Sequence, residues 1–399
     1  MDLPPRSVTL VLCLPDGTVL GSLPTVEVAS PWWQEVGPVV DAARQVTGVE
    51  VTVLRMLGAA SDTGCGGPVT YLAEVDTPVG SLTPWPEPVG DHPLRLPYAR
   101  PGGPAADLAW ADAALTRLGR PRTAAARQVR TWNLSSLWRL PTVDGDAWLK
   151  VVPPFFAHEG AVITALTSPD VPTLLATDGP RLLMVGLPGA DLYEAQGQVL
   201  TRMVSLLVGL QAQWVDRAAE LLELGLPDWR AEPFTEAAAA MLERTAHQLD
   251  LTTRRECERV VAGLPPRFAA LEACGVPDTV VHGDFHPGNL IGDDTHLALL
   301  DWGDCGLGNP LLDRSAFMPR VPRAQRSDVR AHWDDLWRVV APGCDPGRAA
   351  ELVGPVAALR QAVVYDGFVQ AIEPSERVYH AGDSARWLRT LASEVVVHS

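Results

Sequence analysis

One β-rich segment, TVVHGDFHPGNLIGDDTHLALLDWGD (residues 279–304), interrupts long stretches of helical character and constrains the fold more than any other feature of the chain. It begins with a short β-branched strand that stops at His282-Gly283-Asp284. A second strand starts at Leu290, turns through residues 292–295 and returns along apolar residues. The segment therefore predicts a hairpin that follows a polar loop.

Three polar side chains are expected to meet at the open end of this hairpin. Antiparallel pairing would place Asn289 opposite about Leu300 or Asp301, and Asp284 lies on the loop just before. An amide oxygen and a carboxylate on one rim suit a hard divalent cation that keeps its waters and binds phosphate oxygens. The Asp284 carboxylate can accept a hydroxyl proton. These are the parts that phosphoryl transfer requires.

Three short motifs occur in and just after this segment: HGDFHPGN (282–289), DWG (301–303) and GLGNPLLD (306–313). Together they resemble the aminoglycoside phosphotransferase family, whose signature is HGDxxxxN followed by DxGxxGxGxPxxD. The resemblance covers about residues 126–399 and implies a protein-kinase-like fold, a nucleotide donor (ATP or GTP) and Mg²⁺. It also implies that Asp284 is the catalytic residue, that Asn289 and Asp301 hold the magnesium, and that Asp313 is a buried carboxylate that braces the catalytic loop.

The single lysine of the chain lies upstream of these motifs. Lys150 is the only lysine among 32 Lys and Arg residues, and it ends AWLK, which we expect to be the third strand of a small sheet. The resemblance implies that Lys150 contacts nucleotide phosphates and pairs with Glu159 of the following helix. The covering loop lacks the glycines that kinase-like proteins usually place there. Further nucleotide contacts are expected from Ser135, Ser136, Val185 and Leu187.

The predicted fold class is α+β, a bilobal protein-kinase-like fold with an additional small N-terminal α/β domain. A linker rich in Pro and Gly predicts an accessory α/β domain at 1–98, followed by a linker and helix at 99–125. The resemblance implies an N-lobe with the hinge at 126–190 and a helical C-lobe with the catalytic loop and substrate site at 191–399. The first part resembles a degenerate Nudix domain. Residues 41–46 lack the acidic residues of the Nudix metal motif, so we expect no hydrolase activity.

Composition limits the partners and the compartment. The formal net charge of −16 opposes binding to nucleic acid or anionic membranes and is compatible with a cationic substrate. No apolar run reaches the length of a membrane span, and the N-terminus does not read as a signal peptide. Six scattered cysteines suit a reducing cytoplasm. We expect a cytoplasmic protein, and the N-terminal domain is a candidate dimerisation module.

These observations predict an ATP- and Mg²⁺-dependent phosphotransferase that acts on a hydroxyl of a small molecule, such as an aminoglycoside, an amino sugar or a related antibiotic. Candidate substrate-binding residues are Asp191, His286, Asp304, Asp366 and Glu373. Two alternatives remain open. The glycine-poor loop is compatible with a pseudokinase or ligand-binding scaffold, and the same fold serves kinases of primary metabolites such as sugars or amino alcohols.

Overall fold

A computed structural model describes residues 4–60, 64–293 and 295–398. Contacts between Cα atoms divide the chain into two compact units. The first unit is Met1–Ala157, Leu174–Gly186 and Phe368–Ala381, and the second is His158–Thr173, Leu187–Gly367 and Gly382–Ser399. The first unit thus holds both small sheets of the chain's N-terminal part. The finer boundaries expected near residues 98 and 125 stay a prediction.

The first sheet of the first unit has the strand order β2-β1-β5-β4, with β3 paired to β1. Its elements are β1 (Arg6–Cys13), β2 (Val19–Ser22), β3 (Val26–Val28), α1 (Gly37–Thr47), β4 (Thr52–Ala59) and β5 (Gly67–Glu74). Strands β1 and β5 run parallel, whereas the other pairs are antiparallel. The resemblance to a Nudix domain is neither supported nor excluded by this arrangement and stays a prediction.

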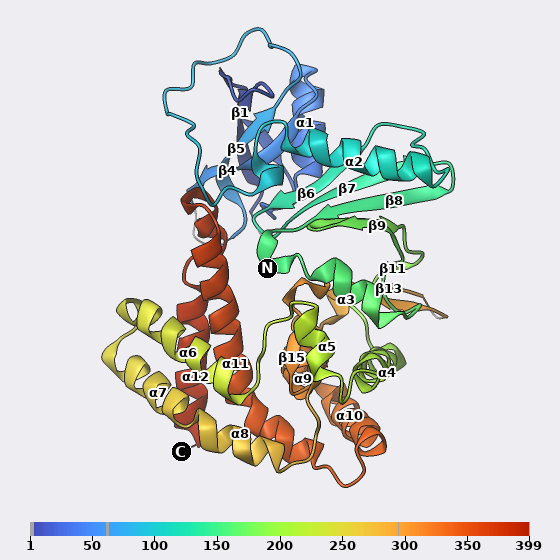
Figure 1. Cartoon of the computed structure of the whole chain (residues 1–399). Helices are drawn as coiled ribbons and strands as arrows, with labels where there is room; N and C mark the ends of the chain where they lie inside the picture. The colour runs from blue at the N-terminus through green and yellow to red at the C-terminus, as the bar shows by residue number, and fades with distance from the viewer. Residues whose placement is uncertain (1–3, 61–63, 294, 399) are drawn as a thin grey trace. The chain divides into compact units, whose positions relative to one another are not determined.

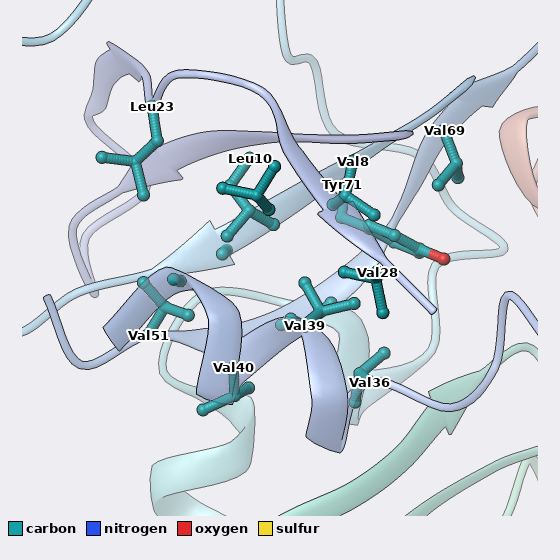
Figure 2. Close-up of a cluster of buried hydrophobic side chains, with 14 of the residues drawn as sticks. Val8, Leu10, Leu23, Val28, Val36, Val39, Val40, Val51, Val69 and Tyr71 are labelled. Carbon is teal, nitrogen blue, oxygen red and sulfur yellow. The ribbon is translucent and has the colours of Figure 1, made fainter. Parts of the chain in front are cut away.

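Alternation along β1 separates two layers of apolar packing. Val8 and Leu10 belong to the larger cluster, together with Val39 of α1 (Figure 2), whereas Val11 and Cys13 pack in a smaller cluster. This is the period of two that places successive side chains on opposite faces of a sheet. Helix α1 ends at Gly48, whose φ of 70° lies in the left-handed region that glycine favours.

The second sheet of the first unit is antiparallel, with the order β6-β7-β8-β10-β9. It comprises β6 (Arg127–Trp132), β7 (Ser135–Thr142), β8 (Gly145–Val151), β9 (Leu174–Asp178) and β10 (Arg181–Val185), and α2 (Gly103–Arg117) precedes it. Lys150 lies on its third strand in chain order, as predicted. The two sheets are joined by Gln128, whose side chain exchanges hydrogen bonds of 2.9 and 2.7 Å with the backbone of Val53.

The second unit is mainly helical, as expected for the C-terminal part (Figure 1). Its helices are α3 (Glu159–Leu166), α4 (Gln198–Ala212), α5 (Ala218–Glu223), α6 (Ala231–Thr245), α7 (Leu251–Ala262), α8 (Leu264–Glu272), α9 (Leu311–Phe317), α10 (Arg326–Val340), most of α11 (Pro346–Ala371) and α12 (Asp383–His398). Its strands form two small sheets, β11 (Ala190–Asp191) with β13 (Leu290–Gly292) and β14 (Leu297–Leu299), and β12 (Thr279–Val281) with β15 (Gly306–Gly308).

Strands β13 and β14 form the hairpin that the sequence predicted. Leu290 pairs with Leu299, and the Leu300 N–H donates to the carbonyl of Asn289 at 2.8 Å. The expected register is therefore confirmed, with Asn289 opposite Leu300. This register brings Asn289, which precedes β13, and Asp301, which follows β14, to the same end of the hairpin.

Helix α11 is long and apolar enough to cross a membrane by length and composition alone. Half of its most apolar 18-residue window is buried inside the protein. Arg360, near the middle of the helix, is also buried and donates hydrogen bonds to two backbone carbonyls. The partial burial of the apolar window and the buried Arg360 are both typical of a core helix in a folded protein.

Candidate active site

The loop between β12 and β13 is anchored by a buried carboxylate on α9. Asp313 accepts the backbone N–H of His282 at 2.8 Å and that of Gly283 at 2.7 Å, and the amide of Gln211 donates to it at 2.9 Å. Burial raises the pKa of Asp313 to about 7, and the N–H groups of Gly283 and His282 act in the opposite direction. Because both oxygens accept N–H donors, the geometry favours the ionised form.

Arg360 of α11 holds the same loop from another side. Its Nη1 donates to the carbonyl of Gly283 at 3.0 Å, and its Nη2 donates to the carbonyl of Asp304 at 2.6 Å. A Cβ at Gly283 would lie 2.1 Å from the Asp304 carbonyl oxygen, and the φ of this residue is +88°. The loop therefore requires glycine here, which explains the second residue of the HGD motif.

Asp284 is held in place by its neighbour Asn289. The Asn289 amide Nδ2 donates to the backbone carbonyl of Asp284 at 2.8 Å and to its carboxylate Oδ2 at 3.0 Å. The amide nitrogen is therefore in use, which leaves the Asn289 carbonyl oxygen as the atom that could bind a cation. His286 accepts the Gly288 N–H on Nδ1, so its neutral form carries the proton on Nε2, which lies 3.5 Å from Oδ2 of Asp284.

His282 has a structural position. It is fully buried, its Nε2 lies 2.8 Å from the Leu300 carbonyl, and its Nδ1 accepts the Asp284 N–H at 3.3 Å. Burial lowers the pKa of His282 to about 4, so the ring is neutral at physiological pH. Both ring nitrogens are engaged by the backbone, which fits the role of fixing the loop rather than binding a metal.

Asp301 follows β14 and adopts a left-handed backbone conformation, with φ 62° and ψ 63°. Such a conformation costs about 1–3 kcal/mol for a residue with a Cβ and is often found at functional sites. Its side chain is exposed. The next backbone N–H, that of Trp302, donates to Glu159 Oε1 at 3.2 Å. Glu159, at the start of α3, is thus placed next to this turn.

The oxygens of Asn289 and Asp301 are the donors that a magnesium ion would find here. Among the described residues, no group of three or more His, Cys, Asp and Glu side chains is arranged to hold a metal by itself. Few protein ligands and an exposed carboxylate suit Mg²⁺, which keeps several waters and completes its shell with phosphate oxygens. The residues present therefore fit the ion that the sequence implied.

The remaining expected nucleotide contacts are divided between the units. Lys150 and Val185 lie on β8 and β10 of the first unit, and Leu187 lies in the second. The pairing of Lys150 with Glu159 stays a prediction. Ser135 and Ser136 are buried, and their Oγ atoms accept indole N–H groups, from Trp132 at 3.3 Å and from Trp138 at 3.0 Å. Each hydroxyl can still donate its own O–H, so a contact of Ser135 or Ser136 with phosphate stays a prediction.

Two of the carboxylates considered for the substrate already have cationic partners. Asp366 is buried and accepts hydrogen bonds of 2.9 and 2.6 Å from Arg244. Glu373 is buried in the first unit and pairs with Arg95 at 2.8 Å and Arg55 at 3.7 Å. Because these charges are already compensated, we correct both assignments and give the two residues a structural role.

The other substrate candidates remain accessible. Asp191 is exposed on β11, where its Oδ1 accepts the Tyr193 N–H at 2.7 Å. Asp304 contributes its carbonyl to Arg360 and keeps a partly exposed side chain. His286 lies beside Asp284, as described above. A substrate role for these three residues stays a prediction.

Two residues of α11 near the catalytic loop were not predicted. Arg360 binds the loop directly, and its sequence signal was an arginine within the apolar stretch 352–364 of α11. Tyr365 is the other: burial raises its pKa well above the usual value, and the charges of Asp383, Asp284 and Asp304 raise it further. Tyr365 therefore lies within electrostatic reach of the candidate catalytic carboxylate.

The sequence matches the model of the APH family, described as a phosphotransferase enzyme family, over residues 138–344, which is just over half of the chain. No curated protein matches the sequence significantly. A solved structure assigned as an aminoglycoside phosphotransferase from Ralstonia eutropha is 15% identical, with 73% of this chain and 97% of that chain covered and a TM-score of 0.50.

Two further structures resemble this chain in the same way. A macrolide 2'-phosphotransferase from Brachybacterium faecium is 19% identical, with 69% of this chain and 97% of that chain covered and a TM-score of 0.49. A choline kinase from Cryptosporidium parvum is 9% identical, with 69% and 90% covered and a TM-score of 0.48. From the family match and the motif geometry, the chain belongs to the APH phosphotransferase enzyme family and is a small-molecule phosphotransferase of protein-kinase-like fold.

Proposed function

We propose that this phosphotransferase moves the γ-phosphoryl group of ATP or GTP to a hydroxyl group of a small molecule. The observation that carries the proposal is the pair Asp284 and Asn289 on a loop whose backbone is held by Asp313 and Arg360. A general base contributes only when it is fixed within reach of the proton that it accepts. The donor nucleotide is proposed from the family.

The two oxygens of Asp284 have different tasks in this proposal. Both Asn289 Nδ2 and His286 Nε2 approach Oδ2, so we assign Oδ1 to the hydroxyl of the acceptor. This oxygen orients the hydroxyl and receives its proton as the new O–P bond forms. Asn289 holds the carboxylate through its amide N–H, and its own carbonyl oxygen would be available to bind the cation.

Asn289 and Asp301 would hold Mg²⁺ in this site. When bound, the ion would neutralise charge on the terminal phosphates of the nucleotide. We propose that Lys150 contacts the phosphates as a point charge and that Glu159 orients it.

Asp284→Asn tests the proposal most directly. The substitution keeps the shape of the side chain but removes the proton acceptor, so kcat should fall at least about a hundredfold while nucleotide affinity is retained. Transfer would be measured by ADP release across amino sugars, aminoglycosides, free sugars and amino alcohols. Asp335→Asn is a matched control, because Asp335 is an exposed residue that pairs with Arg338 on α10. Unchanged turnover in Asp284→Asn would contradict the assignment.

One observation favours a second candidate, a nucleotide-binding scaffold without transfer. The turn between β6 and β7 contains no glycine, and Ser135 and Ser136 give their hydroxyl oxygens to tryptophan indoles. Calorimetric titration with Mg-ATP and Mg-GTP, followed by the acceptor panel, separates the two. Nucleotide binding with no transfer to any acceptor, and no hydrolysis, would favour the scaffold.

The acceptor panel also addresses the alternative that the substrate is a primary metabolite.

Cytoplasmic localisation is part of the proposal, and it is supported by the burial of all six cysteines, which suits thiols in a reducing compartment. A homodimer formed through the N-terminal part stays a prediction. Light scattering of the purified chain would test it.

A further inference from the structure

The second unit contains a cavity of about 450 Å³ between α9, α10, α11 and α12. Apolar side chains make up much of its wall, among them Leu312, Ala316, Ala358 and Trp387. Arg326 and Arg330 of α10 also line it. Among the residues that the structure describes, no Asp or Glu side chain lines this cavity. A cavity of this size and lining can take the body of a small organic molecule.

The walls of the cavity carry the residues that hold the catalytic loop. Arg360 lines the cavity and donates to the carbonyl of Gly283, the residue before Asp284. Leu312 lines it from α9, and the next residue, Asp313, accepts the N–H groups of the loop. The cavity is therefore adjacent to the candidate catalytic site and is not a remote surface pocket.

Helical periodicity indicates which end of the cavity faces Asp284. Gly354, Ala358 and Gln361 line the cavity on one stripe of α11, and Tyr365 is the next position of that stripe. On α12, Trp387 and Thr390 line the cavity, and Asp383 precedes them by one turn on the same face.

Arg360 lines the cavity toward the Tyr365 end of the α11 stripe, and it donates to the carbonyl of Gly283 at 3.0 Å. This end of the cavity therefore faces the loop that carries Asp284. The charge of Asp284 also acts on Tyr365, in agreement with this placement.

The charges of the wall select against a polycation. Arg326 donates to the neutral carbonyls of Val321 at 3.0 Å and of Pro319 at 3.4 Å, and no carboxylate of the described cavity wall faces it. Arg330 is exposed on the next turn of α10. An aminoglycoside would bring several ammonium groups next to these guanidinium groups, and the described wall offers no carboxylate in return. A carboxylate or phosphate on the ligand would instead be attracted.

We propose that the acceptor of this phosphotransferase is a hydroxylated amphiphile with an apolar body and an anionic group. The body lies between Leu312, Ala358 and Trp387, the anionic group lies at Arg330, and the hydroxyl lies at the Tyr365 end beside Asp284. The inference rests on the proposed function for the reaction itself. The hydroxyl oxygen forms a bond to the γ-phosphorus, and the bond from that phosphorus to the β,γ-bridging oxygen breaks. The nucleoside diphosphate then leaves. The hydroxyl proton passes to Asp284.

Three matched probes test the charge preference in binding, without nucleotide: ω-hydroxydodecanoate, dodecane-α,ω-diol and ω-aminododecanol. Their lengths suit the stripe from Gly354 to Tyr365, which spans about 16 Å at the rise of an α-helix. Calorimetry should rank the anion first, the diol second and the cation last, with the anion at least about tenfold tighter than the cation. Equal or tighter binding of the cation, or binding of none of the three, would overturn the proposal.

Arg330→Gln provides the second measurement. Because Arg330 is exposed, the variant should fold, and it should bind the anionic probe at least about fivefold more weakly while its affinity for the diol is unchanged. Arg338→Gln, on the same helix and outside the cavity, is the control and should leave both affinities unchanged. An Arg330→Gln variant that binds the anion as well as the native chain would contradict the assigned orientation.

The outcomes separate this inference from the proposed function. Binding of the anionic probe without transfer to any acceptor would support the cavity assignment and count against the phosphotransferase mechanism. Transfer to an aminoglycoside, with no binding of the anionic probe, would support the mechanism and overturn the inference.

Discussion

Glu376 offers a test of how burial shapes the stability of the first unit. Its side chain is buried in the short helical segment Pro374–Tyr379, where Oε1 accepts the Met56 N–H at 2.6 Å. Burial raises its pKa from 4.5 to about 8, and the nearby charge of Glu373 raises it further, whereas the Met56 N–H and Arg55 oppose the rise. We expect Glu376→Gln to remove a pH dependence of stability that this carboxyl produces.

The sign and size follow from proton binding. Between about pH 4.5 and 8 the folded state holds a proton on Glu376 that the unfolded state has released, so the free energy of unfolding falls as pH rises. Each pKa unit corresponds to about 1.4 kcal/mol, so the full change is about 5 kcal/mol. Glutamine resembles the protonated carboxyl in shape and charge. The variant should match the native chain below about pH 4.5 and exceed it by several kcal/mol above about pH 8.

Urea unfolding of the full chain, followed by tryptophan fluorescence at a series of pH values, measures this difference. Glu27→Gln is the matched control, because Glu27 is exposed on β3 of the same unit. That control should leave the pH dependence of the native chain unchanged. If Glu376→Gln and the native chain showed the same slope of stability against pH, the argument from burial would be refuted.

Three further outcomes are expected. Asp301→Ala should abolish transfer and magnesium-dependent nucleotide binding while the melting temperature is retained, as measured by ADP release, calorimetry and thermal shift. Asn133→Ala should lower the free energy of unfolding by about 1–3 kcal/mol, because its buried side chain binds the Glu376 carbonyl at 3.1 Å and His380 at 2.8 Å, and urea unfolding checks this. Arg360→Met should cost about 3–5 kcal/mol in the same assay, because two loop carbonyls and nearby carboxylates lose their cation.

Local features of the fold could be predicted because they depend on neighbouring residues. The pairing of β13 with β14 follows from alternation around a short polar turn, and it fixed where Asn289 lies. Lys150 was placed on the third strand of its sheet from strand and turn signals, and Glu159 in the helix that follows.

Side-chain partners that come from distant parts of the chain could not be predicted. Glu373 pairs with Arg95, which lies 278 residues away, and Asp366 pairs with Arg244, which lies 122 residues away. A single sequence contains no signal for such a partner, so both carboxylates looked available for a substrate. The hydrogen bond from the Trp138 indole N–H to the Ser136 hydroxyl could not be predicted either, because it depends on side-chain direction in β7.

Net charge says little about the ligand of a cavity, because it is an average over the whole surface. The value of −16 is compatible with a cationic ligand, yet fields from exposed charges are screened over about 8–10 Å at physiological salt. A ligand inside a cavity responds mainly to the groups that line it. Here the described wall presents Arg326 and Arg330, and Asp366 of the same unit is compensated by Arg244. The charged side chains that line the cavity therefore favour an anionic ligand, although the net charge of the chain is negative.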